Sequence, residues 1–405
     1  MAIAYLVADF PKPSETFVSR EILALRELGL DLKPFAFQEP APEEENKLDA
    51  TTRKLIGAVE YLNNGALFAG ALRSWSLARI WRENAELQRT SMFKSNPQLR
   101  LLRAATLATQ LQAAGIRHLH AHWPYATIIA HLVHKLTGIS YSISVHAHEV
   151  EYDYGHFRSV FDSLSFATFC NRAAMERLLE RLPPSARERS HLVYHGVDLN
   201  RFRPLAFPET GGVVKVISAG RLTRSKGFER LVRACATARS LGAPVELTIL
   251  GAGNLESVLR KIAADCGFSD ALHLPGWLPH DRVAESLAGA HIFALMADTD
   301  YGDGLPNVVL EAMASGRPVI LSPLPAAEEA ITNGVEGIIL NSANDEEGMV
   351  NALQRLAGDR AKLPIMGQAA RRRVESEFDQ NIHARRLKGL FEQFARQQPA
   401  SLLAA

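Results

Sequence analysis

The chain has few cysteines, little net charge and no long apolar run. Its three cysteines, Cys170, Cys235 and Cys266, stand far apart and show no metal-ligand spacing, which excludes a disulfide scaffold and a zinc finger. A net charge of +1 excludes a global field that would attract nucleic acid. No apolar stretch approaches the ~20 residues that span a bilayer. We therefore expect a cytoplasmic protein with reduced thiols and no nucleic-acid partner.

The length and the hydrophobic pattern favour two α/β domains. At 405 residues the chain is too long for one core. Residues 2–8 are too short for a signal-peptide core and lack a basic leader, so they predict a first buried strand. Short apolar runs then alternate with amphipathic segments, which is typical of doubly wound parallel sheets covered by helices. In such sheets, ligands bind at the carboxyl ends of the strands.

Individual elements follow from the same pattern. In the first half, strands are predicted at 2–8, 32–37, 116–121, 141–146, 165–169 and 191–194. After a loop at 9–16, a helix is predicted to run to Gly29 with Ser14 as its N-cap, and 40–60 is predicted as a surface loop. In the second half, strands are predicted at 213–218, 245–250, 271–274, 291–295 and 317–321. Helices are predicted at 227–241, 254–266, 280–289, 306–315, 346–357 and 361–396.

The segment 196–212 is rich in proline and glycine, as in a linker. We therefore expect an N-terminal domain at 1–203 and a second domain at 204–378. Residues 379–405 are expected to form a C-terminal helix and tail, and packing of that helix on the first domain is one open arrangement.

The stretch 303–320 carries the strongest chemical signal. Asp303 lies in a Gly/Pro loop, and a second acid, Glu311, follows eight positions later. Between them Pro306-Asn307 predicts a helix start, because proline has no N–H to lose in the first turn. Such a start aims N–H groups and the positive end of the helix dipole at a ligand. Carboxylates beside such a terminus suit a ligand with both hydroxyls and phosphates, such as a nucleotide sugar.

This stretch resembles the acid-x7-acid motif of glycosyltransferase family 4, retaining enzymes of the GT-B fold. The matching residues are Gly304, Leu305, Pro306, Glu311, Ala312, Met313, Gly316, Pro318 and Val319. The chain departs at the first acid, where Asp303 stands in place of the usual Glu. The resemblance implies two Rossmann-like domains facing across a cleft. An ordinary loop–helix–strand unit is the alternative interpretation.

A second element opens the second domain. Residues 218–227 contain a Gly-Arg turn after a strand, followed by Lys226-Gly227. Arg221 and Lys226 could converge on a diphosphate or could be two solvated cations. The run resembles the family's Gly-Arg-Leu-x-x-x-Lys-Gly element, and Gly251 and Gly253 resemble its Gly-x-Gly turn, although strand–helix packing needs the same glycines.

The resemblance assigns roles to these positions. Asp303 would hold sugar hydroxyls and act in catalysis, and Glu311 would bind the ribose diol. The residues expected to bind the donor are Gly220, Arg221, Lys226, Gly251, Gly253, Gly304, Leu305, Pro306, Asn307, Val308 and Glu311.

The first domain supplies the other candidates. Residues 144–149 resemble the family's His-x-x-Asp/Glu loop, so His146 would be a catalytic residue that contacts the donor sugar; His148 is a weaker candidate, and both could be structural. Residues 10–17 resemble a loop of enzymes that build bacterial exopolysaccharides, although the usual Gly-Gly is absent. Its acceptor-side candidates are Ser14, Glu15 and Thr16.

Two patterns suggest metal ligands. His118, His120 and His122 alternate as on one face of a strand, but no cysteine or carboxylate accompanies them in the sequence. Asp298-Thr-Asp300 could bind a divalent ion or could be an acidic solvated loop. Because Arg221 and Lys226 could carry the phosphate charge, we expect no metal and no cofactor beside the nucleotide-sugar co-substrate.

These features predict a retaining hexosyltransferase (EC 2.4) that moves a sugar from a nucleotide sugar to a saccharide or lipid-linked acceptor. The pathway expected is cell-surface polysaccharide synthesis, of exopolysaccharide or lipopolysaccharide. Two alternatives remain: an epimerase or phosphorylase of the same fold, and a non-catalytic nucleotide-sugar binder, which Asp303 motivates.

Residues 61–135 contain nine Lys and Arg against two acids. Within them, 66–82 shows apolar residues at helical spacing beside arginines. This segment predicts either an amphipathic helix on the anionic inner face of the cell membrane or a helix packed on the first domain.

Overall fold

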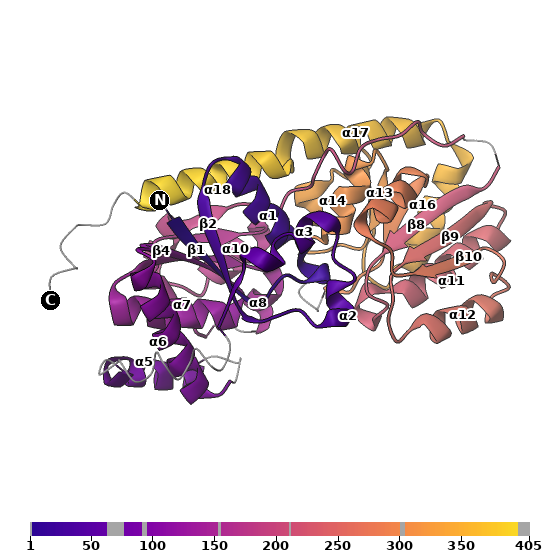
Figure 1. Cartoon of the computed structure of the whole chain (residues 1–405). Coiled ribbons are helices and arrows are strands. Elements are labelled where there is room, and N and C mark those ends of the chain that lie inside the picture. The colour runs from indigo at the N-terminus through magenta and orange to yellow at the C-terminus, as the bar shows by residue number, and fades with distance from the viewer. Residues whose placement is uncertain are drawn as a thin grey trace. The chain divides into compact units, whose positions relative to one another are not determined.

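The computed structural model describes residues 2–62, 77–90, 95–152, 155–209, 212–299 and 304–395. The chain divides into two compact units (Figure 1). The first unit comprises Met1–His195 with His383–Ala405, and the second comprises Gly196–Ile382. The domain boundaries expected from the sequence, at 203/204 and 378/379, stay predictions. Each unit is built on a parallel sheet, which confirms the predicted α/β class.

The first sheet has the strand order β3-β2-β1-β4-β5-β6-β7, and every neighbouring pair is parallel. The strands are β1 (Ala2–Asp9), β2 (Asp31–Gln38), β3 (Glu60–Tyr61), β4 (His118–His122), β5 (Ser140–Val145), β6 (Ala167–Phe169) and β7 (Ser190–Leu192). The order reverses between β1 and β4, so the loops that follow these two strands diverge at a switch point, where ligands bind in such sheets.

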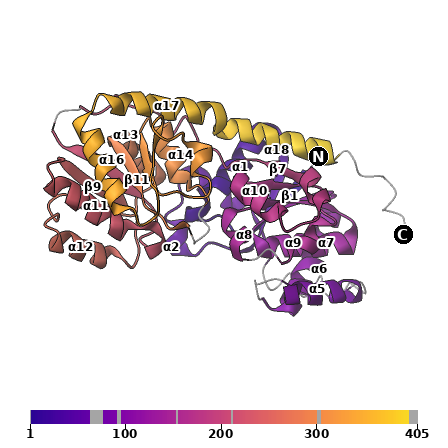
Figure 2. The same ribbon diagram turned by 180° about the vertical axis from the view of Figure 1, so that it is seen from behind.

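Helices cover both faces of this sheet. They include α1 (Thr16–Glu27), α5 (Leu77–Thr90), α6 (Pro97–Ala113), α7 (Pro124–Thr137), α8 (Ala147–Tyr152), α9 (Phe157–Phe161), α10 (Arg172–Leu179) and α18 (Gln380–Ala395). Alternate residues of β1 serve the two faces: Ala4 and Leu6 pack in the core of α6 and α7, while Tyr5 and Val7 pack in the core of α1 and α18. Figures 1 and 2 show α5 and α6 stacked beyond α7.

The second sheet has the order β10-β9-β8-β11-β12-β13 and is also parallel. Its strands are β8 (Val214–Ala219), β9 (Val245–Leu250), β10 (Leu272–Gly276), β11 (Ile292–Leu295), β12 (Val319–Leu321) and β13 (Gly337–Ile339). Its helices include α11 (Phe228–Ser240), α12 (Glu256–Asp265), α13 (His280–Ala288), α14 (Asn307–Ala314), α16 (Glu346–Gly358) and α17 (Lys362–Glu377). The switch point lies between β8 and β11. Among the described residues, no helix is long and apolar enough to span a bilayer.

Three sequence expectations were wrong. Helix α1 begins at Thr16 after a 3-10 turn, Pro13–Glu15, so Glu15 and not Ser14 is its N-cap. The segment 40–60 contains the short helices α2 (Pro42–Glu45) and α3 (Ala50–Arg53), and Leu55 is buried there. The single helix predicted at 361–396 is broken at Phe378-Asp379, because the Phe378 carbonyl accepts from Val197 N–H and the Val197 carbonyl accepts from Gln380 N–H.

Close backbone contacts hold the carboxyl edge of the second sheet together. A Cβ on Gly251 would lie 1.9 Å from the carbonyl oxygen of Gly220, and one on Gly227 would lie 1.9 Å from that of Met296. Gly227 also has a φ of +66°, which L side chains rarely adopt. Only glycine therefore lets these loops approach so closely.

Replacing Gly227 by Ala should destabilise the protein by at least about 2 kcal/mol, because the methyl group meets Met296 and the left-handed backbone is strained. The measurement is the free energy of unfolding in urea. Gly358→Ala is the matched control: it ends α16 with nothing within 4 Å of the added atom, so it should be neutral or stabilising by up to about 1 kcal/mol. Equal effects of both substitutions would contradict the packing argument.

Candidate functional site

In the second unit, the predicted donor-binding residues gather at the carboxyl ends of neighbouring strands. Gly220 and Arg221 follow β8, and the 3-10 turn Arg224–Lys226 leads through Gly227 into α11. The Arg221 side chain is exposed, and the stem of Lys226 lies over Gly220, 3.7 Å from the position of an added Cβ. The loop after β11 contacts this turn, because Asp298 N–H donates to the Ser225 carbonyl. Two cations therefore stand at the switch point of the sheet.

The turn Gly251–Gly253 has a packing role. Gly220 N–H donates to Leu250, and Leu222 N–H donates to Ala252. A Cβ on Gly253 would lie 2.5 Å from the Leu222 carbonyl oxygen. These glycines bring the loop after β9 against the loop after β8, which is the packing alternative that the sequence left open.

Helix α14 begins at Asn307, one residue after the predicted start at 306, so Pro306 is its N-cap and not its first residue. Pro306 makes no side-chain cap hydrogen bond at this end. Gly304 is buried, and residues 305–308 are half-buried. The first turn of α14 therefore presents its N–H end at the edge that follows β11.

Glu311 lies one turn into α14 and is 4% exposed. Its Oε1 lies 3.5 Å from Nε2 of His280, the first residue of α13. The carboxylate oxygens of Glu311 could therefore accept hydrogen bonds from the hydroxyl groups of a ligand.

Two acids of the neighbouring loop, Asp303 and Asp300, lie outside the described residues. Asp298 is described, and its Oδ1 pairs with Arg230, which also donates to the Met296 carbonyl over 2.8 Å. This carboxylate is thus held in an ion pair, which neither the metal-ligand nor the solvated-loop interpretation anticipated.

In the first unit, the loop after β1 is tied to the end of β4. Trp123 follows β4 with a φ of +74°, a strained conformation for a bulky residue. Its indole N–H donates to Glu15 over 2.9 Å. Burial raises the pKa of Glu15, although Lys12 and the Trp123 N–H act in the opposite direction. The Thr16 hydroxyl accepts from Arg20, and Ser14 lies in the 3-10 turn.

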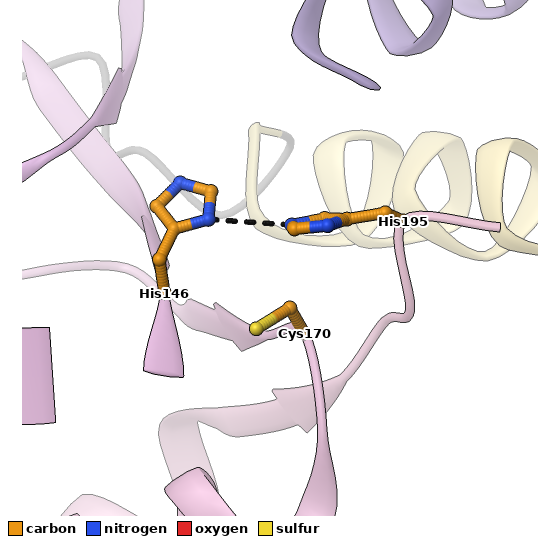
Figure 3. A group of neighbouring side chains, drawn as sticks. All are labelled: His146, Cys170 and His195. Carbon is orange, nitrogen blue, oxygen red and sulfur yellow. Dashed lines mark hydrogen bonds between the residues drawn. The ribbon is translucent and has the colours of Figure 1, made fainter. Parts of the chain in front are cut away.

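His146 follows β5 and is 3% exposed. Its ring stacks on Trp123 with 3.9 Å between centroids. Its Nε2 lies 3.3 Å from Nδ1 of His122. Its Nδ1 lies 3.2 Å from Nε2 of His195 (Figure 3). The His146 backbone N–H donates to Glu149, which explains the His-x-x-Glu spacing as a cap on α8. Nothing is described of the His148 side chain.

A carboxylate sets the direction of this histidine chain. Glu21 Oε1 lies 3.2 Å from His122 Nε2 and also accepts from the Tyr5 hydroxyl. Burial acts to raise the pKa of Glu21, but His122 and Tyr5 outweigh it, so the pKa is lowered. An ionised Glu21 favours a proton on His122 Nε2, which leaves His122 Nδ1 to accept from His146 Nε2–H. His146 Nδ1 then accepts from His195.

The other strand histidines are structural. His118 bonds to Ser140 and Ser142, and His120 bonds to Ser142 and Ser144, all at 2.7–3.0 Å. Burial lowers the pKa of His118 to about 3. The three histidines share one face of β4, as predicted, but Glu21 is a carboxylate beside them that the sequence did not reveal. The sequence signal that could have revealed Glu21 is its spacing from Phe17, because residues four apart in a helix lie on the same face.

Residues 205–373 match the family model "Glycosyl transferases group 1". The chain is 25% identical to the amylovoran biosynthesis glycosyltransferase AmsK of Erwinia amylovora, over 98% of this chain and 100% of that one. It is 30% identical to the GDP-mannose-dependent alpha-(1-6)-phosphatidylinositol monomannoside mannosyltransferase of Mycobacterium tuberculosis, over 60% of this chain and 67% of that one.

The fold is similar to that of HepE of Anabaena, solved in complex with UDP. The TM-score is 0.74 at 15% identity, and the match covers 97% of this chain and 100% of that one. At this identity the match supports the fold alone, and it confirms the predicted GT-B fold class.

Replacing Glu21 by Gln should cost about 1 to 3 kcal/mol of stability at neutral pH, because a charged acceptor of two bonds is lost. The native contribution is fully present above the ordinary Glu pKa of 4.5 and is lost as the pH falls through the lower folded value. The difference between the variant and the native chain should therefore shrink on acidification, as measured by urea unfolding at several pH values. Glu27→Gln, an exposed position on the same helix, should show no such trend.

Proposed function

Because the chain is a glycosyltransferase that belongs to the group 1 glycosyl transferases, we propose that it moves a hexose from a nucleotide sugar to a saccharide or lipid-linked acceptor. The acceptor we propose is a growing cell-surface polysaccharide. Support for this acceptor comes from the similarity to AmsK, which covers all of that enzyme. The nucleotide-sugar donor is supported by the mannosyltransferase relative, whose name specifies GDP-mannose, and by the fold shared with the UDP complex of HepE.

One observation carries the donor assignment: two cations and a helix N-terminus lie at neighbouring strand ends of one sheet. We propose that Arg221 and Lys226 bind the diphosphate, together with the backbone N–H groups of Gly304, Leu305, Asn307 and Val308. A departing nucleoside diphosphate gains negative charge, so these groups would stabilise the transition state more than the ground state. Glu311 would accept from the ribose hydroxyls, as the motif implies.

We propose that Asp303 and His146 act at the sugar. The anomeric carbon becomes oxocarbenium-like as the diphosphate departs, so an acceptor oxygen near it is favourable. Asp303 would supply that oxygen and hold sugar hydroxyls. Both ring nitrogens of His146 have hydrogen-bond partners inside the first unit, so its contact would be by an edge of the ring, or would follow a change in these bonds.

We propose that the acceptor lies against the loop after β1. Ser14, Glu15 and Thr16 belong to the loop after β1, at the switch point of the first sheet. Membrane contact through 66–82 also remains a proposal, because 63–76 lie outside the described residues. In the described part of α5, Trp81 is 60% exposed, which suits either a membrane or a partner.

The donor proposal is tested with a panel of UDP-, GDP- and ADP-sugars. The correct donor should raise the unfolding temperature and be hydrolysed slowly without acceptor, because a ligand that binds only the folded state stabilises it. Arg221→Ala should weaken donor use by about 10- to 100-fold in kcat/KM, since a charge-assisted bond is lost. Arg224→Ala, an exposed neighbour, is the control and should change little. No response to any sugar nucleotide would contradict the proposal.

The catalytic role of Asp303 is tested by two substitutions. Asp303→Asn should abolish most turnover while donor binding, measured by calorimetry, persists. Asp303→Glu restores the residue usual in the family and should retain turnover. A chain with no turnover in any of the three forms, but with unchanged donor binding, would instead be the non-catalytic binder.

A further inference from the structure

Three side chains with metal-ligating atoms converge at the carboxyl edge of the first sheet. His146 follows β5, Cys170 follows β6 and His195 closes the segment after β7, and these strands are neighbours. One atom from each, a histidine nitrogen or the cysteine sulfur, lies within 4.8 Å of the other two (Figure 3). His146 Nδ1 and His195 Nε2 are 3.2 Å apart.

We propose that this cluster binds one divalent ion of the zinc class through His146 Nδ1, His195 Nε2 and Cys170 Sγ. Two imidazoles and a thiolate are ligands that Zn²⁺ prefers, and three protein ligands leave a fourth position for water. Tetrahedral ligands at about 2.0–2.1 Å from zinc place two nitrogens about 3.3 Å apart. The observed separation fits, so the histidines need little movement.

The surroundings prepare His146 to be a ligand. The carboxylate of Glu21, 3.2 Å from His122 Nε2, favours the tautomer in which His146 carries its proton on Nε2, and in that tautomer the Nδ1 lone pair is directed at the cluster. A ligating histidine in a metal site commonly donates its other ring N–H in this way. Glu21 and His122 thus already provide the hydrogen-bond partners that would orient His146 as a metal ligand.

The sulfur has matching neighbours. The Asn171 amide donates to Cys170 Sγ over 3.4 Å, and the backbone N–H of Ala147 also favours the thiolate. Burial nevertheless raises the pKa of Cys170 to about 12, so the thiol is protonated without a metal. Binding therefore replaces the S–H bond by a metal–sulfur bond and releases one proton to solvent. His195 moves its proton from Nε2 to Nδ1.

A second cluster in the same unit is less suitable. Glu21, His120 and His122 also lie within reach of one ion. Both ring nitrogens of His120 are bonded to serines in the buried face of the sheet, so an ion there would break two hydrogen bonds.

Binding has a functional consequence. An ion on Nδ1 fixes the His146 ring, so Zn²⁺ inhibits transfer and takes no part in it. This consequence rests on the role proposed for His146, whereas binding of the ion does not.

The test is a titration of the full-length, metal-free protein with Co²⁺, a spectroscopic substitute for zinc. One equivalent should produce a thiolate-to-cobalt charge-transfer band and tetrahedral ligand-field bands, and Zn²⁺ should displace both. Cys170→Ser should remove the charge-transfer band, whereas Cys266→Ser, at an exposed cysteine, should keep it. Loss of the band only in Cys266→Ser, or no band in the folded native chain, would overturn the proposal.

Two further variants separate a ligand site from a structural cluster. His195→Gln should weaken Co²⁺ binding by more than 10-fold, and His122→Asn should weaken it by about 10- to 100-fold through loss of the outer shell. If Cys170→Ser does not fold, the Co²⁺ affinity of His195→Gln decides whether the cluster is a metal site. Unchanged affinity in both histidine variants would also overturn the site.

Activity separates this inference from the proposed function. Zn²⁺ should inhibit the native chain, and Cys170→Ser should keep basal transfer but lose the inhibition. Cobalt binding without any transfer by the native chain would sink the proposed function and leave the metal site standing. Sugar transfer without cobalt binding would contradict the metal site and leave the proposed function standing.

Discussion

Parallel pairing constrains everything else in this molecule. Parallel strands all end at the same edge of a sheet, so residues far apart in sequence meet there without any local signal. In the first unit this edge joins the loops after β1, β4, β5, β6 and β7, and in the second it joins those after β8, β9 and β11. The two edges are stabilised differently. The second relies on glycines that let backbones touch, whereas the first relies on bonded side chains such as Glu15 to Trp123 and Glu21 to His122.

The strands and their class could be predicted from sequence, since buried parallel strands form apolar runs that alternate with amphipathic helices. The pairing between strands could not. His118, His120 and His122 alternate in β4, and Ser140, Ser142 and Ser144 alternate in β5. Only the observed register places each histidine opposite a serine and so turns two patterns into one hydrogen-bonded ladder.

The candidate site was predictable where it is contiguous in sequence. The helix start at Pro306 and the turn from Gly220 to Gly227 are local patterns, and the structure has both. Glu21, Cys170 and His195 were missed because their importance depends on tertiary contacts with His146 and His122. The break at Phe378 was missed for the same reason: the helical pattern continues through it, but bonds from residue 197 compete for the backbone.

The position of α18 has a consequence for how the protein is made. Its residues Leu387, Leu390 and Phe391 complete the core that α1 and the odd residues of β1 begin, although more than 350 residues separate them. A ribosome adds these residues after the entire second unit, so the face of the first sheet that α1 covers in part stays incompletely covered while that unit is synthesised. The nascent chain must keep the uncovered part of that apolar face from other molecules until α18 emerges, and a polypeptide truncated before α18 would leave it exposed permanently.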